Sequence, residues 1–151
     1  MSQILKLLRF YFVLLALFTV GRWSMGMAGV PYEKGHHIFS LVTLAFLASA
    51  HHAAFSRGFL GWRIGRAMGI GLTIGLVTQS VVFLSTAISY LADIHSYFNY
   101  PTALNVKEAI PFATAMMTRT AGLVFNSLFN SIAAAIGWLM GGVLPKREDL
   151  V

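Results

Sequence analysis

The stretch AMGIGLTIGLVTQSVVFLSTAISYL, at residues 67–91, decides the fold. It contains no charged residue, and it is longer than the roughly 20 apolar residues that a helix needs to cross the hydrocarbon core of a bilayer. Backbone N–H and C=O groups find no water there, so a spanning segment of this kind has to be helical. The stretch therefore predicts a membrane-spanning helix.

Three further apolar segments surround this one, at about residues 5–22, 37–55 and 112–144. Of the 151 residues, 57% are hydrophobic and only 11% are charged, whereas a soluble domain has about 25% charged residues. No segment shows the alternating apolar and polar pattern of a membrane β-barrel. We therefore expect an all-α protein with one integral membrane domain over residues 1–151, a four-transmembrane-helix bundle.

Basic residues predict the orientation of this bundle. Seven of the eleven fall on the side shared by the two termini and the central turn, namely Lys6, Arg9, Arg57, Arg63, Arg66, Lys146 and Arg147. The remaining four fall on the opposite side. The positive-inside rule then places both termini in the cytoplasm and predicts a multi-pass protein, which we assign to the bacterial cytoplasmic (inner) membrane. The formal charge is +6. Because the basic residues cluster where the apolar segments end, they determine topology, and we do not expect nucleic acid as a partner.

The first segment resembles the start of a secretory signal peptide, because Lys6 and Arg9 precede an apolar run. Arg22 and Trp23, however, occupy the region where small uncharged residues would form a cleavage site. We expect the segment to be retained as a membrane anchor.

Two stripes of small and polar residues carry the most information. On the last segment, positions at helical spacing are small or polar, and the third segment has a matching set. Lipid favours apolar side chains, so such stripes predict surfaces that face other helices. The predicted packing stripe consists of Gly71, Gly75, Thr86, Asp93, Arg119, Asn126, Asn130, Gly137 and Gly141.

A register follows if Asp93 and Arg119 lie at the same depth in an antiparallel pair. Thr86 would then lie beside Asn126, Gly75 beside Gly137 and Gly71 beside Gly141. Structural packing explains these residues by itself, because small residues and amides commonly join membrane helices. A second interpretation is that Gln79, Asn126 and Asn130 line a polar cavity or a ligand site.

The five histidines raise the question of a cofactor. His36 or His37 opens the second segment, and His95 follows the third on the same side, so that such a pair could hold a b-type haem, with Arg119 nearby. His51 and His52 lie near the other end of the second segment and have no third histidine to meet them. The spacings match no zinc or di-iron pattern, and we predict no metal site and no resident cofactor outside the haem alternative.

The sequence lacks the residues and motifs that would indicate a particular catalytic chemistry. There is no cysteine, no carboxylate in the middle of a segment and no recognisable nucleophile or phosphate-binding motif. We therefore expect a non-enzymatic accessory, anchoring or assembly component of a membrane complex, which contacts the lipid bilayer and either other membrane subunits or further copies of itself. The alternatives are an electron-transfer subunit that binds one b-type haem or quinone near the outer face, and an oligomeric pore or carrier for a small neutral solute.

Overall fold

The computed structural model describes residues 3–143, and within this range every regular element is helical. Long helices are joined by short helical pieces and turns. In chain order the elements are α1 (Gln3–Leu7), α2 (Arg9–Met27), α3 (Tyr32–Gly35), α4 (Leu41–Leu60), α5 (Ile64–Leu91), η1 (Pro101–Leu104), α6 (Phe112–Met140) and η2 (Gly141–Val143). The all-helical expectation is confirmed for this part of the chain.

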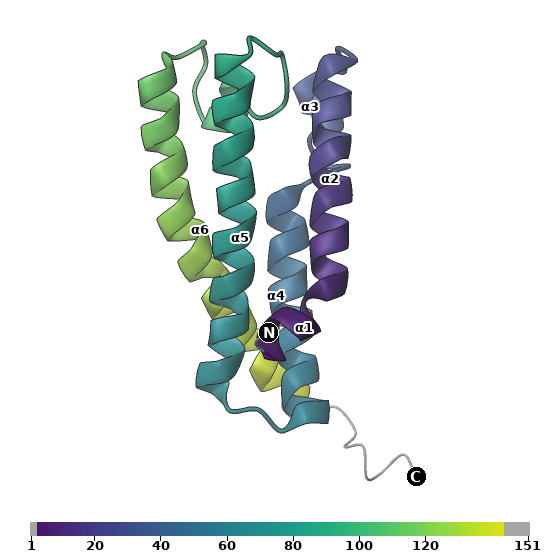
Figure 1. Cartoon of the computed structure of the whole chain (residues 1–151). Helices are drawn as coiled ribbons and strands as arrows, with labels where there is room; N and C mark the ends of the chain where they lie inside the picture. The colour runs from purple at the N-terminus through teal and green to yellow at the C-terminus, as the bar shows by residue number, and fades with distance from the viewer. Residues whose placement is uncertain (1–2, 144–151) are drawn as a thin grey trace.

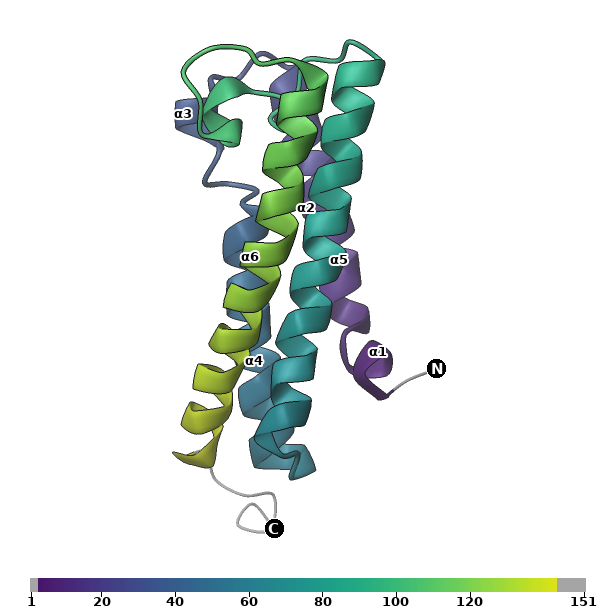
Figure 2. The ribbon, with the colours of Figure 1, turned by 90° about the vertical axis from the view of Figure 1, so that its left-hand side faces the viewer.

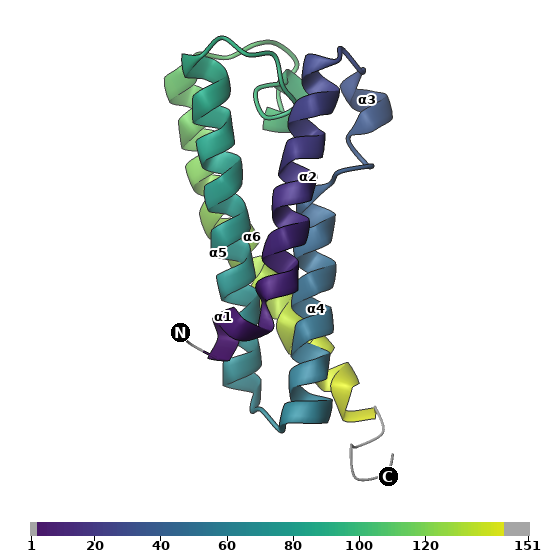
Figure 3. The same ribbon diagram turned by 45° about the vertical axis from the view of Figure 1, so that its right-hand side comes forward.

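The four long helices run alternately up and down (Figure 1). The tight turn between α4 and α5 lies at the end of the bundle that also holds α1, whereas α3 and the segment with η1 lie at the opposite end (Figures 1 and 3). We call these two ends the turn end and the loop end. The most extensive helix contact joins α5 and α6, and the next joins α4 and α6, while α2 makes few contacts with α4.

Three helical stretches are long and apolar enough to cross a membrane, namely Arg9–Met27, Ile64–Leu91 and Phe112–Val143. The chain is thus a multi-pass membrane protein by the length and composition of its helices. The helix α4 is of similar length, but His51, His52 and Arg57 lower its mean hydropathy. By length and mean hydropathy together, α4 is not among these candidate membrane spans.

The ends of α4 differ from the predicted segment at residues 37–55. The helix begins at Leu41 because the hydroxyl of Ser40 accepts a hydrogen bond from the backbone N–H of Thr43, which satisfies a donor at the helix start. It continues to Leu60 and ends at Gly61, whose positive φ of 63° suits a residue without a side chain. Both ends of α4 therefore lie nearer the C-terminus of the chain than predicted, because the capping residues Ser40 and Gly61 determine where the helix begins and ends.

The register predicted for α5 and α6 is wrong by about two helical turns. A Cβ atom on Gly75 would lie 2.6 Å from the Cα of Ser127, and one on Gly71 would lie 2.7 Å from the Cβ of Ala134. At the other end of the pair, Arg119 meets Thr86. Seven residues at a rise of about 1.5 Å correspond to a shift of roughly 10 Å along the helix axis.

The shift changes the partners of the stripe residues. Gly137 and Gly141 lie against the backbone of Ala50 and Ala54 on α4, and they do not face the glycines of α5. Asp93 lies beyond the C-terminal end of α5, is exposed and has a positive φ of 51°. The structure therefore uses α6 as the shared helix, which contacts α5 with one set of small residues and α4 with another (Figure 2).

Hydroxyl and amide groups fill the interior of the bundle. The Ser49 hydroxyl donates to the side-chain oxygen of Asn130 at 2.9 Å, which joins α4 to α6. The Tyr11 hydroxyl meets that of Thr78, which joins α2 to α5. Serine and threonine hydroxyls on α5 also donate to carbonyl groups one turn earlier, so these polar groups stay paired in an apolar surrounding.

Candidate anion-binding cavity

A polar cavity of about 310 Å³ lies at the loop end of the bundle, between α3, η1, the start of α4 and the N-terminal half of α6. Its most distinctive feature is that two arginines from different helices line the same space. The lining residues are Arg22, Tyr32, His36, Ser40, Leu41, Val42, Val82, Phe98, Thr102, Ala103, Asn105, Arg119 and Asn126. We call it the arginine cavity.

Arg22 is positioned by aromatic rings. It lies near the C-terminal end of α2, and its guanidinium carbon is 5.5–5.7 Å from the ring centroids of Tyr32, Tyr97 and Phe98. One of its terminal nitrogens donates to the Tyr32 hydroxyl at 3.2 Å. Cation–π contacts of this kind hold a positive charge without neutralising it.

Arg119 is positioned by neutral oxygens. It lies two turns into α6, where its Nε donates to the Thr86 hydroxyl at 3.0 Å and a terminal nitrogen donates to the carbonyl of Phe98 at 2.8 Å. A guanidinium has five N–H donors, and these two bonds use only two of them. Arg119 therefore keeps hydrogen-bonding capacity on the cavity side.

Among residues 3–143, no carboxylate lines the arginine cavity. The acidic side chains of the described region, Glu33, Asp93 and Glu108, are all exposed. Asp93 was predicted to lie level with Arg119, but Arg119 instead bonds to Thr86 and Phe98. The two guanidinium charges repel each other, and within residues 3–143 no acidic group of the cavity wall offsets that repulsion.

Tyr97 supports the cavity from the loop between α5 and η1. Its hydroxyl donates to the carbonyls of Val30 and Pro31, at 2.8 and 3.1 Å, and so ties this loop to the segment before α3. Burial raises the pKa of the Tyr97 phenol, and the nearby positive charge of Arg22 lowers it by a smaller amount. The neutral phenol is therefore the form that holds the two loops together.

The predicted haem ligands do not meet in one cavity. His36 lines the arginine cavity, where its Nδ1 donates to the Tyr32 carbonyl at 2.9 Å and its ring stacks on Tyr32. His95 is exposed and lines a separate cavity of about 680 Å³, between the end of α5 and residues 26–31. His37 is exposed beside His36. A haem bound by both partners of the predicted pair would have to bridge two separate cavities.

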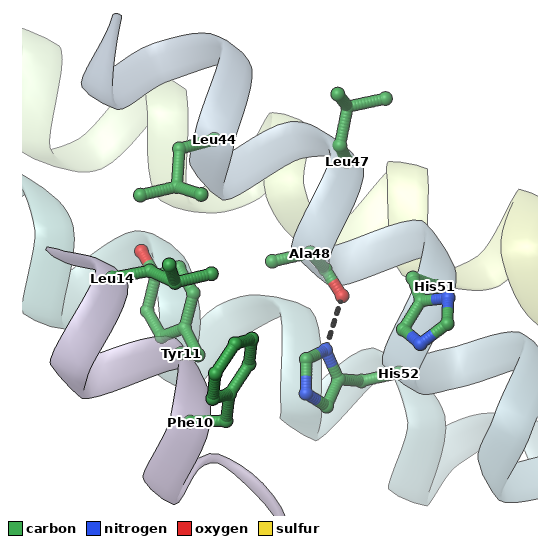
Figure 4. Close-up of a pocket in the computed structure, with 8 residues that line it drawn as sticks. All are labelled: Phe10, Tyr11, Leu14, Leu44, Leu47, Ala48, His51 and His52. Carbon is green, nitrogen blue, oxygen red and sulfur yellow. Dashed lines mark hydrogen bonds between the residues drawn. The ribbon is translucent and has the colours of Figure 1, made fainter. Parts of the chain in front are cut away.

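His51 and His52 line a third hollow, an apolar cleft of about 480 Å³ between α2 and α4 (Figure 4). Phe10, Leu14, Leu44 and Leu47 form most of its wall, and the Nδ1 of His52 donates to the Ala48 carbonyl at 2.8 Å. No ligand role was predicted for these two histidines, because no third histidine was expected to meet them. Among the described residues, no aspartate, glutamate, lysine or arginine lines this cleft.

The three amides that were predicted to line a polar cavity have different partners. Asn126 lines the arginine cavity, whereas Asn130 is buried and bonded to Ser49 and Gln79 is buried on α5. A Cβ atom on Gly122 would lie 3.6 Å from the side-chain nitrogen of Asn126 and 3.8 Å from the side-chain oxygen of Gln79, so these two amides lie on the same side of α6. Sequence reasoning did not select Arg22 as a site residue. The available signal was a charged residue inside an apolar stretch, which in membrane proteins often marks a functional site.

Comparisons with known proteins give one partial similarity. A glycerol-3-phosphate acyltransferase from Thermosynechococcus vestitus is 33% identical to this chain over 72 residues, which are 48% of this chain and 33% of the enzyme. This chain thus matches about a third of the length of that relative. No protein-family model and no solved structure matches the chain.

Proposed function

We propose that this protein crosses the bacterial cytoplasmic membrane four times, with α2, α4, α5 and α6 as the spans and both termini on the cytoplasmic side. Support for α4 comes from its length and from its position alongside α6, with which it shares the Ser49–Asn130 hydrogen bond. Support for the orientation comes from Arg57, Arg63 and Arg66, which cluster around the turn end. Reporter fusions at the two termini, at Gly61 and at Gly29 test this topology.

We infer that the function of the bundle is to bind an anionic group in the arginine cavity. The observation that carries this proposal is the meeting of Arg22 and Arg119 in one space whose lining has no carboxylate. Two unneutralised guanidiniums in a region of low dielectric constant repel each other, and an anion between them removes that repulsion. Guanidinium groups also match the planar, two-oxygen geometry of phosphate and carboxylate.

The proposed role is binding within a membrane complex, as an accessory or assembly component, and not catalysis. The cavity wall contains no carboxylate that could serve as a general base. The single imidazole, that of His36, bonds to a backbone carbonyl and stacks on Tyr32. These features suit a site that holds and orients an anion.

Thermal unfolding in mild detergent tests the binding proposal. Inorganic phosphate, sn-glycerol 3-phosphate and short-chain phosphatidylglycerol serve as probes, and the doubly substituted Arg22→Gln/Arg119→Gln protein is compared with an Arg63→Gln control at an exposed position. We expect at least one probe to raise the Tm of the wild type and of the control, but not of the double variant. If every probe acts equally on all three proteins, the arginine cavity is not an anion site.

A second candidate function is acyl transfer to a phosphate-bearing acceptor. The observation that favours it is the similarity to the glycerol-3-phosphate acyltransferase over 72 residues. The anion cavity would then hold the phosphate of the acceptor. Incorporation of a labelled acyl chain into sn-glycerol 3-phosphate by the purified protein tests this candidate, with the double arginine variant as the control.

A further inference from the structure

We infer that the anion bound in the arginine cavity is the headgroup phosphate of a membrane phospholipid that enters sideways from the bilayer between α4 and α6. This inference rests on the proposed anion-binding function and names the class of its ligand. Three features carry it: the way the two helices separate, the combination of charged and apolar groups in the lining, and the cover on the outer side of the cavity.

The glycine contacts between α4 and α6 lie toward the turn end. There, Gly137 and Gly141 lie against the backbone of Ala50 and Ala54. The last cross-link toward the loop end is the buried hydrogen bond between Ser49 and Asn130. Beyond it, Leu41 and Val42 of α4 and Asn126 of α6 line the arginine cavity.

The lining of the cavity combines charged and apolar side chains. Arg22 and Arg119 line its outer part, and Val82 lies one turn deeper on α5 than Thr86, the partner of Arg119. Asn126 lies seven residues beyond Arg119, which is a depth of about 10 Å at the rise of an α-helix. Two guanidiniums beside apolar side chains such as Val82 and Val42 suit an amphiphile with an anionic headgroup.

Val42 marks the side on which the cavity meets the bilayer. It lines the cavity on α4, yet 54% of its surface is exposed, and Phe46, one turn further along α4, is 45% exposed. On the outer side, by contrast, Tyr32 and His36 of the α3 region and residues 102–105 of the η1 region line the cavity. The apolar side is therefore open to acyl chains, whereas access from the aqueous phase passes the segments that contain α3 and η1.

The volume of the cavity agrees with a headgroup site. At about 310 Å³ it lies at the lower end of the range for ligand pockets, about 300–1,000 Å³. It holds a phosphate headgroup with the beginning of the acyl region, and the rest of the tails would pass Val42 into the membrane. Guanidinium groups bind the oxygens of a phosphate with two parallel hydrogen bonds, which suits a phosphate headgroup.

Native mass spectrometry of the full chain, released from nanodiscs, tests the inference. The nanodiscs contain either phosphatidylglycerol or phosphatidylcholine, and inorganic phosphate and sn-glycerol 3-phosphate are the soluble probes. We expect the wild type to retain phosphatidylglycerol at least tenfold more than the Arg22→Gln/Arg119→Gln protein. The Arg22→Lys/Arg119→Lys protein, which keeps both charges, should retain an intermediate amount, so a loss of folding is distinguished from a loss of charge.

A second pair of variants tests the sideways entry. Val42→Trp narrows the exit for the tails and leaves both arginines in place, and Val13→Trp on α2 is its matched control, because Val13 is 56% exposed and outside the cavity. We expect Val42→Trp alone to reduce retention of phosphatidylglycerol, without changing the binding of soluble phosphate.

The outcomes separate the inference from the proposed function. Binding of phosphate or sn-glycerol 3-phosphate that depends on the arginines, with no retained lipid and no effect of Val42→Trp, overturns the lipid inference and leaves the proposed function intact. Equal retention of both phospholipids by all variants shows surface lipid only and overturns the inference as well. The absence of any arginine-dependent binding overturns both.

Discussion

Gly71 on α5 lies directly against the backbone carbonyl of Asn130 on α6. One turn further along, Gly75 lies against Ser127 and Asn130, so the two backbones approach each other without intervening side chains. Close approach of this kind strengthens van der Waals contact between membrane helices, where the hydrophobic effect contributes little. The glycines therefore set the distance between α5 and α6.

Replacing Gly71 with alanine should separate these helices. The new methyl group would meet the carbonyl of Asn130 and the side chain of Ala134, and overpacking of this kind costs about 1–3 kcal/mol. Gly69 is the matched control, since a Cβ there has only Ile4 at 3.9 Å, and alanine is favoured over glycine within a helix by about 0.5–1 kcal/mol. Unfolding in detergent should show a lower Tm for Gly71→Ala and an unchanged or higher Tm for Gly69→Ala. Equal effects would contradict the register described above.

The hydrogen bond between Ser49 and Asn130 should contribute measurably to the packing of α4 on α6. A double-mutant cycle with Ser49→Ala and Asn130→Ala isolates the interaction, for which we expect a coupling energy of about 0.6 kcal/mol and at most about 2 kcal/mol. Unfolding by a denaturing detergent provides the free energies. A coupling energy of zero would mean that the two side chains act independently.

Arg57 should stabilise the C-terminal end of α6. Its guanidinium carbon lies 4.0 Å from the ring centroid of Trp138, and one terminal nitrogen donates to the carbonyls of Trp138 and Leu139. A positive charge at a helix C-terminus and a cation–π contact each contribute about 0.5–2 kcal/mol. Arg57→Gln should therefore lower the Tm more than Arg57→Lys does, while Arg63→Gln at an exposed site should leave the Tm unchanged.

The stability of the loop end should fall at alkaline pH because of Tyr97. Burial raises its pKa, so the folded state favours the neutral phenol. The stability from this group is fully present below the pKa of an unfolded tyrosine, about 10, and is lost as the pH rises through the higher folded value. Tyr97→Phe removes the hydrogen bonds to Val30 and Pro31 and should lower the Tm at neutral pH. The difference between the variant and the wild type should shrink above pH 10, and a constant difference would exclude this role.

The helical segments were predictable because hydrophobic length reports directly on the membrane environment. The two ends of α4 were harder to predict. The helix begins after the Ser40 cap and ends at the left-handed Gly61, and both depend on local backbone geometry. The register of α5 and α6 was wrong for a different reason. Every small residue on one stripe can face every small residue on the other, and only the contacts of Gly137 and Gly141 with α4 remove that ambiguity.

The candidate site was predicted in part. Arg119 and Asn126 belong to the predicted stripe, and His36 to the predicted cofactor ligands, and all three line the arginine cavity. Arg22 was considered for the orientation of the bundle and as evidence against a cleavage site, and it was not predicted as a site residue. Its position beside Tyr32, Tyr97 and Phe98 depends on how the loops fold back over the bundle, which the periodicity of the helices does not encode.

The light attachment of α2 has a consequence for biogenesis. Only Tyr11 and Leu15 of this helix are buried, whereas α4, α5 and α6 are joined to one another by extensive contacts. The three later helices therefore form a contact network of their own, against which α2 docks. Since α2 supplies Arg22, the anion site is complete only when docking has finished. Binding of an anion would then distinguish a fully assembled molecule from one in which α2 has not docked.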